Sequence, residues 1–461
     1  MKNDARSKWL RQGLAYSLIA FYGLGAELQA SQSTIEILFA FPCDPNTKVC
    51  PQGKEPTSLI QGSDGNFYGT TEFGASGNEG TVFKLTPAGN LITLYTFVAT
   101  ANGANPTSLV EGNDGFLYGT TGAGGVNNQG VVFKLSKTGT IQVLHSFCSL
   151  TNCADGNQPF NLVLGNNGDF YGCTTYSFPG TLFRITSSGS YALLHTFQVS
   201  VDGPQAIGMT LASDGNIYGD TLGGFSLPTV LFRLTEEGKL TAVHSWRYSQ
   251  FPVSPLTQTT SGYLRGVLSH LQGVAGSGMF KIERSGAGYQ EVPLFYPFSG
   301  QVVRYMIQAS DKNFWGVFGA NILNFTQNGQ LLQQVAVGST SGSQPALLVQ
   351  ASNGALVGLT NDGGFDSEDP GEIFTVEPSL ASPKPFFVSF SPSSGTVGSK
   401  VMIHGVHFIG STRVTFNGVS ANFEVLNTGN IQATVPTGAR NRTDRSHERC
   451  RKRRKPAEFH S

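Results

Sequence analysis

Little of this sequence is charged, and long apolar runs are missing. Charged residues make up 13% of the 461 residues, and there are only 3 Trp and 5 Met. Helix surfaces draw mainly on Ala, Leu, Glu, Lys and Arg, so this composition disfavours a mainly helical fold. No segment after the N-terminus approaches the roughly 20 apolar residues of a transmembrane helix, so we expect no membrane span in the mature chain. Gly, with 58 residues, and Phe, with 33, are plentiful and favour turn-rich β structure.

The N-terminus has the pattern of an export signal. Four basic residues precede a short apolar stretch at 14–25, and the small residue Ala30 follows it. This stretch is too short to cross a bilayer core, whereas a basic start and a short apolar run are typical of a secretory signal peptide. We therefore predict a signal peptide over 1–30 with cleavage after Ala30. The protein would then be secreted, or held at the cell surface or in the periplasm.

Charge is unevenly distributed along the chain. Residues 1–30 carry a net charge of +2 and residues 440–461 one of +6, so the body between them is net −8 in a chain whose total is zero. An acidic body disfavours nucleic-acid binding, which relies on Lys and Arg against phosphate. The basic tail could in principle contact nucleic acid or an anionic surface, but export makes this unfavourable. We predict a monomer with no nucleic-acid partner.

The cysteines suggest two local disulfides. Cys43 and Cys50 frame "CDPNTKVC", and Cys148 and Cys153 frame "CSLTNC", each directly after an apolar run. Two pairs at the same place in two repeats predict disulfides Cys43–Cys50 and Cys148–Cys153 in an oxidising compartment. A zinc site would require all four thiols to converge from separate repeats. Cys173 has no evident partner, so we expect a buried free thiol.

A short motif recurs along most of the chain. The octet "DGNFYGTT" at 64–71 returns as "DGFLYGTT" at 114–121, "NGDFYGCTT" at 167–175 and "DGNIYGDT" at 214–221. Its glycine recurs at intervals of 42 to 53 residues when looser copies are included, and such a period is typical of repeat architectures. Seven units are thereby defined, marked by Gly69, Gly119, Gly172, Gly219, Gly266, Gly316 and Gly358.

Each unit contains four short β-like runs. In the first unit they are "TSLIQG", "NFYGTT", "TVFKLT" and "LITLYTF", separated by turn signals such as Asp-Gly. Four antiparallel strands in a unit of this length match one propeller blade, whereas a linear solenoid would need capping units. The last unit lacks the fourth run, and a spare copy, "IEILFAF", stands at 35–41. We therefore predict an all-β chain with a seven-bladed β-propeller over 33–378, closed by the N-terminal strand.

The residues after the repeats change character. The segment 385–438 alternates short apolar runs with Gly, Ser and Pro, which is typical of an immunoglobulin-like β-sandwich. Such a sandwich should continue with a further strand, but 439–461 is a basic tail with few strand formers. We expect a truncated sandwich and a tail that is disordered or frame-shifted, so that any anchor would be missing.

Two segments resemble known families. "DGNFYGTT…GTVFKLTPAGNLITLYTF" resembles the GloVer tandem repeat of exported bacterial proteins, most closely over 57–246. Residues 385–438 are similar to an IPT/TIG domain through "SPSSGTVGSKVMIHGVHF", "VTFNGVSA" and "ATVPTGA". The first resemblance implies export, and the second implies an accessory module for binding or spacing. Neither family implies a reaction.

Histidines, tyrosines and serines form no recognisable catalytic pattern. His145, His195 and His244 recur on the predicted outer strands of three different blades, whereas metal ligands must converge on one ion. The octet tyrosines could stack on sugars, but aromatic packing between blades is the expected role. No serine stands in a nucleophile-elbow setting. We therefore expect a binding protein without a resident cofactor.

Carboxylates are the best prospect for ion binding or acid–base work. Glu72 and Glu79 lie in one loop of unit one, and Asp366, Glu368 and Asp369 lie in the equivalent loop of unit seven. Several oxygen ligands could hold Ca²⁺, although the spacing is not that of an EF-hand. Paired carboxylates could instead serve general acid–base catalysis. A solvated acidic loop is the simpler interpretation.

Loop length indicates which face of the propeller binds. The turns between strands one and two and between strands three and four are tight, whereas the other connections are irregular and hold both cysteine pairs. Variable loops on a rigid scaffold are where recognition usually occurs. We hypothesise an exported, non-enzymatic protein that recognises a glycan or protein ligand through these loops. An extracellular carbohydrate-active enzyme with carboxylates on the same face is the alternative.

Overall fold

The computed structural model describes most of the chain after the N-terminal segment. It covers residues 33–439 and 458–460, apart from 45, 176–178, 224–226, 247–249, 253–255, 260–261, 271–277, 283–288, 294–302, 304, 338–344, 362–369 and 378. The predicted signal peptide, with its cleavage after Ala30, lies outside the described residues. So do Asp366, Glu368 and Asp369.

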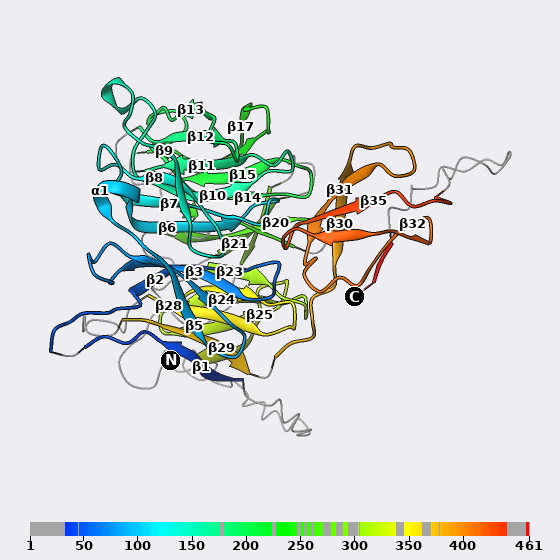
Figure 1. Ribbon diagram of the computed structural model, residues 1–461, viewed down its shortest axis with the longest axis horizontal. Helices are drawn as coiled ribbons and strands as arrows, with labels where there is room; N and C mark the ends of the chain where they lie inside the picture. Colours follow the sequence, from blue (N-terminus) through cyan, green and yellow to red (C-terminus); the bar gives the residue numbers. More distant parts are fainter. Residues whose placement is uncertain are drawn as a thin grey trace, which may run out of the picture. The chain divides into compact units, whose positions relative to one another are not determined.

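Units one to four each form a four-stranded antiparallel sheet whose strands pair in chain order. Units one and two comprise β2 (Lys54–Gln61), β3 (Phe67–Phe73), β4 (Thr81–Leu85), β5 (Leu91–Thr96), β6 (Ala104–Glu111), β7 (Leu117–Ala123), β8 (Val131–Leu135) and β9 (Ile141–Ser146). Units three and four comprise β10 (Pro159–Leu164), β11 (Phe170–Thr174), β12 (Thr181–Ile185), β13 (Tyr191–Thr196), β14 (Ala206–Leu211), β15 (Ile217–Thr221), β16 (Thr229–Leu234) and β17 (Leu240–Trp246). The first strands β6, β10 and β14 of successive units follow one another (Figure 1).

The divergent units keep a similar arrangement. Units five and six contain β18 (Gln250–Pro252), β19 (Thr257–Gln258), β20 (Leu264–His270), β21 (Gly278–Ile282), β22 (Tyr289–Pro293), β23 (Tyr305–Gln308), β24 (Phe314–Phe318), β25 (Asn321–Phe325) and β26 (Leu331–Ala336). However, the first strand of unit five is divided into β18 and β19, which both pair with β20. Unit seven contains β27 (Pro345–Gln350), β28 (Leu356–Thr360) and β29 (Glu372–Glu377). Its fourth strand is β1 (Thr34–Ala40), which pairs antiparallel with β29 from Thr34↔Glu377 to Ala40↔Glu372. Within the described residues, helix is confined to α1 (Ala99–Asn102) and a 3-10 turn (Thr151–Cys153), neither of which could span a membrane.

The octet begins with a turn that is tied to its own tyrosine. The Tyr68 hydroxyl donates to the Asp64 carboxylate at 2.8 Å, and Tyr118 donates to Asp114 at 2.7 Å. Burial opposes ionisation of Asp64, but hydrogen bonds from Asn66 and Tyr68 outweigh it and lower the pKa of Asp64 to about 2. The tyrosine rings are fully buried among residues of the following unit. The octet tyrosine is therefore a structural residue that packs between units.

The octet glycine makes room for an aromatic ring on the next strand. Gly119 pairs across the sheet with Phe133, and a Cβ at Gly119 would overlap both the Phe133 ring and the Ser108 carbonyl oxygen. A cross-strand Phe ring occupies the same place in five further units, at Gly69, Gly172, Gly219, Gly266 and Gly358. The closest neighbours of the octet glycine are therefore the Phe ring of the "VFKL" strand and a backbone carbonyl oxygen.

Five of these six rings receive an aromatic side chain from the preceding unit. The sixth, Phe374 of unit seven, lies in the same buried cluster as Val337 of unit six. The Phe97 ring, at the end of β5, lies 5.3 Å from Phe133, and Phe147 lies 5.2 Å from Phe183, both edge-on. Phe41, which follows β1, makes the same contact with Phe83 of unit one at 5.6 Å. The recurring "LYTF" and "LHSF" endings therefore carry an inter-unit contact, and β1 carries the corresponding one for unit seven.

A backbone hydrogen bond also joins successive units. The Asn105 N–H donates to the Glu79 carbonyl oxygen of unit one at 2.9 Å, and the Glu55 N–H donates to the Pro370 carbonyl oxygen of unit seven at 2.7 Å. Both donor residues adopt positive φ, 55° for Asn105 and 57° for Glu55. Because such a conformation is uncommon for residues other than Gly, its recurrence at the same place indicates an equivalent junction.

The C-terminal segment forms a small β-sandwich. One sheet pairs β30 (Phe386–Ser391), β31 (Lys400–Val406), β35 (Asn430–Thr434) and β34 (Phe423–Val425). The other pairs β33 (Val419–Ser420), β32 (Arg413–Phe416) and β36 (Glu458–His460). Part of the predicted tail therefore supplies a short strand, whereas residues 440–457 lie outside the described residues.

The substitution Gly119→Ala tests the role of the octet glycine. We expect it to destabilise the protein by about 1–3 kcal/mol, since the new methyl group would displace a packed ring. Gly122→Ala, in the same strand, is the matched control because its Cβ would meet only ordinary contacts at 3.5 Å or more. Urea denaturation of both variants gives the comparison. Equal effects at the two positions would contradict the assignment.

Candidate functional site

The two rims of the repeat region differ in their connections. We use "hairpin rim" for the turns that join strands one to two and three to four, such as 62–66 and 86–90. We use "loop rim" for the connections that join strands two to three and four to one, which include 41–53, 74–80, 97–103, 124–130, 147–158 and 197–205. Helix α1 belongs to the loop rim (Figure 1). The irregular connections are therefore displayed together, as the sequence predicts.

Both predicted disulfides form, and both brace the loop rim. Cys43 pairs with Cys50, and Cys148 pairs with Cys153. Cys173 is a buried free thiol, as predicted, and burial raises its pKa well above the usual value. Because a reactive cysteine needs thiolate character and exposure, Cys173 is a packing residue.

Side chains on the outer strands fix the conformation of the four-to-one loops. His145 Nε2 lies 3.1 Å from Asp155 Oδ2, and His195 Nε2 lies 2.6 Å from Asp202 Oδ2. Asp155 is fully buried and accepts bonds from both the backbone N–H and the hydroxyl of Ser149. Burial outweighs the attraction of Asp155 and lowers the pKa of His145. These histidine–aspartate pairs fix the conformation of their loops, and we call them His–Asp pins. Within the described residues, no three His, Cys, Asp or Glu side chains gather around a potential metal position.

Exposed aliphatic side chains gather on the pinned loops. Among the described residues, the loop-rim positions are Val49, Val98, Val126, Leu150, Val201 and Leu222, and Val126 is 83% exposed. Val49 and Leu150 lie within or beside the two disulfide loops.

These loops contact one another through hydrogen bonds. Gly125 N–H donates to the Ala99 carbonyl oxygen at 2.8 Å, and Asn127 Nδ2 donates to the Cys148 carbonyl oxygen at 2.9 Å. The loops that carry Val98, Val126 and Leu150 are therefore held against one another.

The acidic candidates of unit one lie on the same rim, Glu72 near the end of β3 and Glu79 in the connection that follows it. Glu72 is half-buried, and burial together with the charge of Glu55 raises its pKa. Glu79 contributes its backbone oxygen to the junction with Asn105. The calcium and acid–base interpretations stay predictions, since Asp366, Glu368 and Asp369 lie outside the described residues.

Asp220 is a buried carboxyl that sequence reasoning did not identify. It occupies the octet position of Thr70, which shares short hydrogen bonds with Thr57 and Ser58. In unit four the strand partner is Gly208 instead of a serine, and both Asp220 oxygens are buried with no hydrogen-bond partner within the described residues. Burial raises the pKa of Asp220 well above its usual value. The signal in the sequence was the change from "YGTT" to "YGDT".

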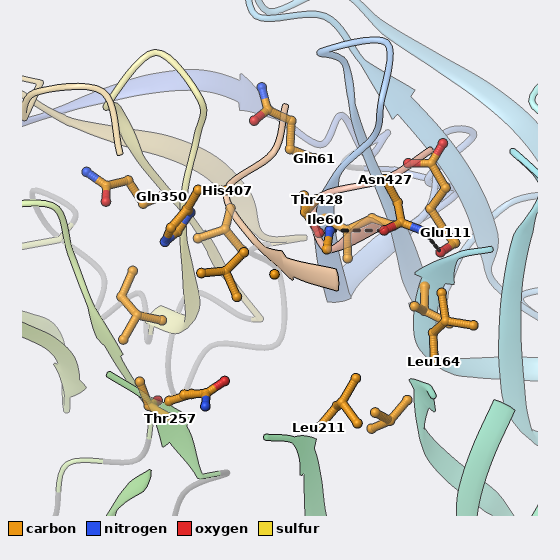
Figure 2. A pocket seen from close by; sticks show the side chains of 18 of the residues that line it. Ile60, Gln61, Glu111, Leu164, Leu211, Thr257, Gln350, His407, Asn427 and Thr428 are labelled. Carbon is orange, nitrogen blue, oxygen red and sulfur yellow. Dashed lines mark hydrogen bonds between the residues drawn. The ribbon is translucent and has the colours of Figure 1, made fainter. Parts of the chain in front are cut away.

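A cavity opens at the hairpin rim, on the side opposite the predicted binding face. Its volume is about 530 Å³, and it is lined by the ends of the first strands of all the units and by residues of the C-terminal sandwich. Figure 2 shows Gln61, Gln350, His407 and Asn427 along one part of the wall, and Leu164 and Leu211 along another. Asn427 Nδ2 donates to Asn113 Oδ1 at 2.9 Å and so links the sandwich to unit two.

Comparison with known families accounts for both regions of the chain. The model of the Gloeobacter/Verrucomicrobia repeat matches residues 13–227 and 57–282, and that of the IPT/TIG domain matches residues 385–447. The second match extends beyond the boundary predicted at residue 438. Among curated proteins, none matches this sequence significantly.

Solved structures share the fold at low sequence identity. Virginiamycin B lyase from Staphylococcus aureus is 16% identical with a TM-score of 0.54, covering 76% of this chain and 100% of that one. A fungal alcohol oxidase of the AA5 family, in complex with copper, is 11% identical with a TM-score of 0.52, covering 84% and 91%. The extracellular domain of a hybrid two-component system from B. thetaiotaomicron is 12% identical with a TM-score of 0.50, covering 79% and 50%. These similarities show a propeller-like fold and nothing of activity.

The substitution Asp220→Val should stabilise the protein at pH 7. Valine is the residue at this position in units five and six, as Val267 and Val317. Above about pH 4 the unfolded chain ionises while folded Asp220 holds its proton, so wild-type stability falls as pH rises. We expect Asp220→Val to raise the free energy of unfolding by about 1–3 kcal/mol at pH 7. This increase should become smaller towards pH 3.

Thermal denaturation between pH 3 and pH 8 measures the effect. Thr120→Val is the control, because the Thr120 hydroxyl has partners in Thr107 and Ser108 and its loss should bring no gain. A gain for Asp220→Val that does not depend on pH would contradict the assigned cause.

Proposed function

Because the chain belongs to the Gloeobacter/Verrucomicrobia repeat family and carries an IPT/TIG domain, we propose that it is an exported, non-enzymatic binding protein. Its loop rim recognises the surface of another protein. The two disulfides are compatible with an extracellular location. The signal peptide predicted from the first 30 residues supports export as well.

The observation that carries this proposal is the set of six exposed aliphatic side chains that the described part of the loop rim carries. Exposed apolar side chains that lie together on one face mark interaction surfaces. The disulfides and the His–Asp pins reduce the conformational freedom of the loops, so less entropy is lost on binding. The octet tyrosines that could have stacked on sugars are fully buried, which favours a protein ligand over a glycan.

We further infer that the sheets close into one seven-bladed ring. Three contacts between unit seven and unit one support closure, since each repeats a contact found between other units. They are the Phe41–Phe83 ring pair, the Glu55–Pro370 backbone bond, and the bond from Ser352 N–H to Gln61 Oε1, which matches that from Ser310 N–H to Gln350 Oε1.

An extracellular carbohydrate-active enzyme is the second candidate. The raised pKa of Glu72 is of the kind that general acid catalysis uses. Glu72→Gln should abolish product release from a glycan panel if this function holds. The same substitution should leave binding to a protein partner unchanged if the first function holds.

Substitution on the loop rim tests the proposed function. Val126→Asp places a charge among the exposed aliphatic side chains of the loop rim. Ile92→Asp is the matched control, because Ile92 lies on the outer strand β5 and is 56% exposed. Partners captured from an envelope extract of the source organism would be quantified by mass spectrometry, in parallel with a glycan panel. We expect a protein partner that wild type and Ile92→Asp retain and that Val126→Asp retains about tenfold less, since burying an unpaired charge is unfavourable.

Two results would contradict the proposal. One is a partner lost by Ile92→Asp but kept by Val126→Asp. The other is loss of a glycan, with no protein partner, when Val126 is replaced.

A further inference from the structure

The cavity at the hairpin rim is separate from the proposed recognition surface. It lies at the ends of the first strands where the tight turns begin, whereas the loop rim begins at their other ends. Its volume of about 530 Å³ falls within the range of roughly 300–1,000 Å³ that is usual for small-molecule sites. The cavity can therefore be considered as a site of its own.

The wall of the cavity is mainly aliphatic. Six first strands each contribute a branched side chain, namely Ile60, Val110, Leu162, Leu211, Ile307 and Val349. The seventh, β19, contributes Thr257 and Gln258 instead. An aliphatic wall of this kind gains free energy by removing apolar ligand surface from water.

The IPT/TIG domain completes the cavity on one side. Phe386, His407 and the turn 427–430 line it. This side is held in place by Asn427 and Asn430, whose amide groups both donate to Asn113 Oδ1 at 2.9 Å. The cavity therefore depends on contributions from both domains.

The described lining carries no uncompensated charge. The Glu111 carboxylate accepts bonds from the Ser63 N–H and hydroxyl at 2.7 Å, and it pairs with Lys137 Nζ at 2.5 Å. Burial raises the pKa of Tyr305 and lowers the pKa of His407, so both side chains are neutral at pH 7. A charged ligand would find no counter-charge here and would lose its hydration.

One lining residue carries a polar group without a partner. Gln258 Nε2 is buried and has no hydrogen-bond partner within the described residues, although it belongs to a cavity-lining side chain. A buried donor without a partner is unfavourable. Because Nε2 itself is not open to the cavity, an acceptor oxygen on a bound molecule would satisfy it once the Gln258 side chain turns towards the cavity.

We propose that this cavity is a binding site for one neutral, mainly apolar small molecule that presents a hydrogen-bond acceptor to Gln258. The aliphatic wall holds the body of the molecule, and Gln258 fixes its orientation. The IPT/TIG domain closes over the site, so it is part of the binding site as well as a spacer.

Nile red, a neutral dye with a carbonyl acceptor, serves as the probe on the full chain. We expect saturable 1:1 binding with a blue shift of its emission. Val349→Trp fills the cavity and should weaken binding by about tenfold or more. Gln258→Leu removes the donor while leaving the volume nearly unchanged, and should weaken binding by roughly two- to tenfold.

Two controls separate the cavity from other apolar surfaces. Ile92→Trp adds the same bulk on an exposed outer strand, and Val126→Asp alters only the loop rim; both should bind Nile red as wild type does. Val110→Trp replaces Val349→Trp if circular dichroism shows that the latter is misfolded. Binding that is not saturable, or that survives both cavity-filling and Gln258→Leu, would overturn the proposal. Loss of binding with Val126→Asp alone would assign the dye to the loop rim and would overturn it too.

Discussion

The contact on which the repeat region depends is an aromatic pair seated on a glycine. In units one to five the octet glycine leaves space that the Phe of the third strand fills. That Phe receives an aromatic side chain from the end of the preceding unit's outer strand. The glycine therefore affects the contact between units indirectly, because it leaves room for the ring that packs against the preceding unit. Since edge-to-face pairs contribute beyond their buried area, repetition of this contact gives the units a fixed spacing.

Because these contacts lie in the cores of the units, the loops can differ from one unit to the next. The cores of the units are held by Gly, Phe and Tyr at fixed places, and the loops are attached by separate interactions that vary in chemistry. Tyr95 bonds to Asn102 in unit one, whereas His145 and His195 bond to Asp residues in units two and three. A histidine at this place is thus one way of fixing the loop conformation, which gives its recurrence a structural role.

Much of the fold could be predicted because the repeat encodes it locally. The turn, the buried tyrosine and the glycine recur at constant spacing, and the spare run at 35–41 identified the strand that pairs with β29. Both disulfides could be predicted because each pair frames a short loop. The immunoglobulin-like module was predicted from its strand pattern and matches the IPT/TIG family.

The cavity could not be predicted, for a physical reason. Ile60 and Val110 alternate with other apolar residues in their strands, and the sequence does not distinguish a side chain that faces a neighbouring sheet from one that faces the central space. That distinction depends on how the units pack and on where the IPT/TIG domain lies against them. The unpartnered amide of Gln258 likewise exists only in the assembled structure.

Phe41 tests the central claim most directly, because it makes the aromatic contact between the end of the N-terminal strand and unit one. Phe41→Ala and Phe97→Ala should each cost about 3–5 kcal/mol of unfolding free energy, within about 1 kcal/mol of one another, in urea denaturation that stays a single cooperative transition. That result would mean that the N-terminal strand joins unit seven to unit one as firmly as any other junction. A cost for Phe41→Ala that is only a small fraction of the cost for Phe97→Ala would contradict it.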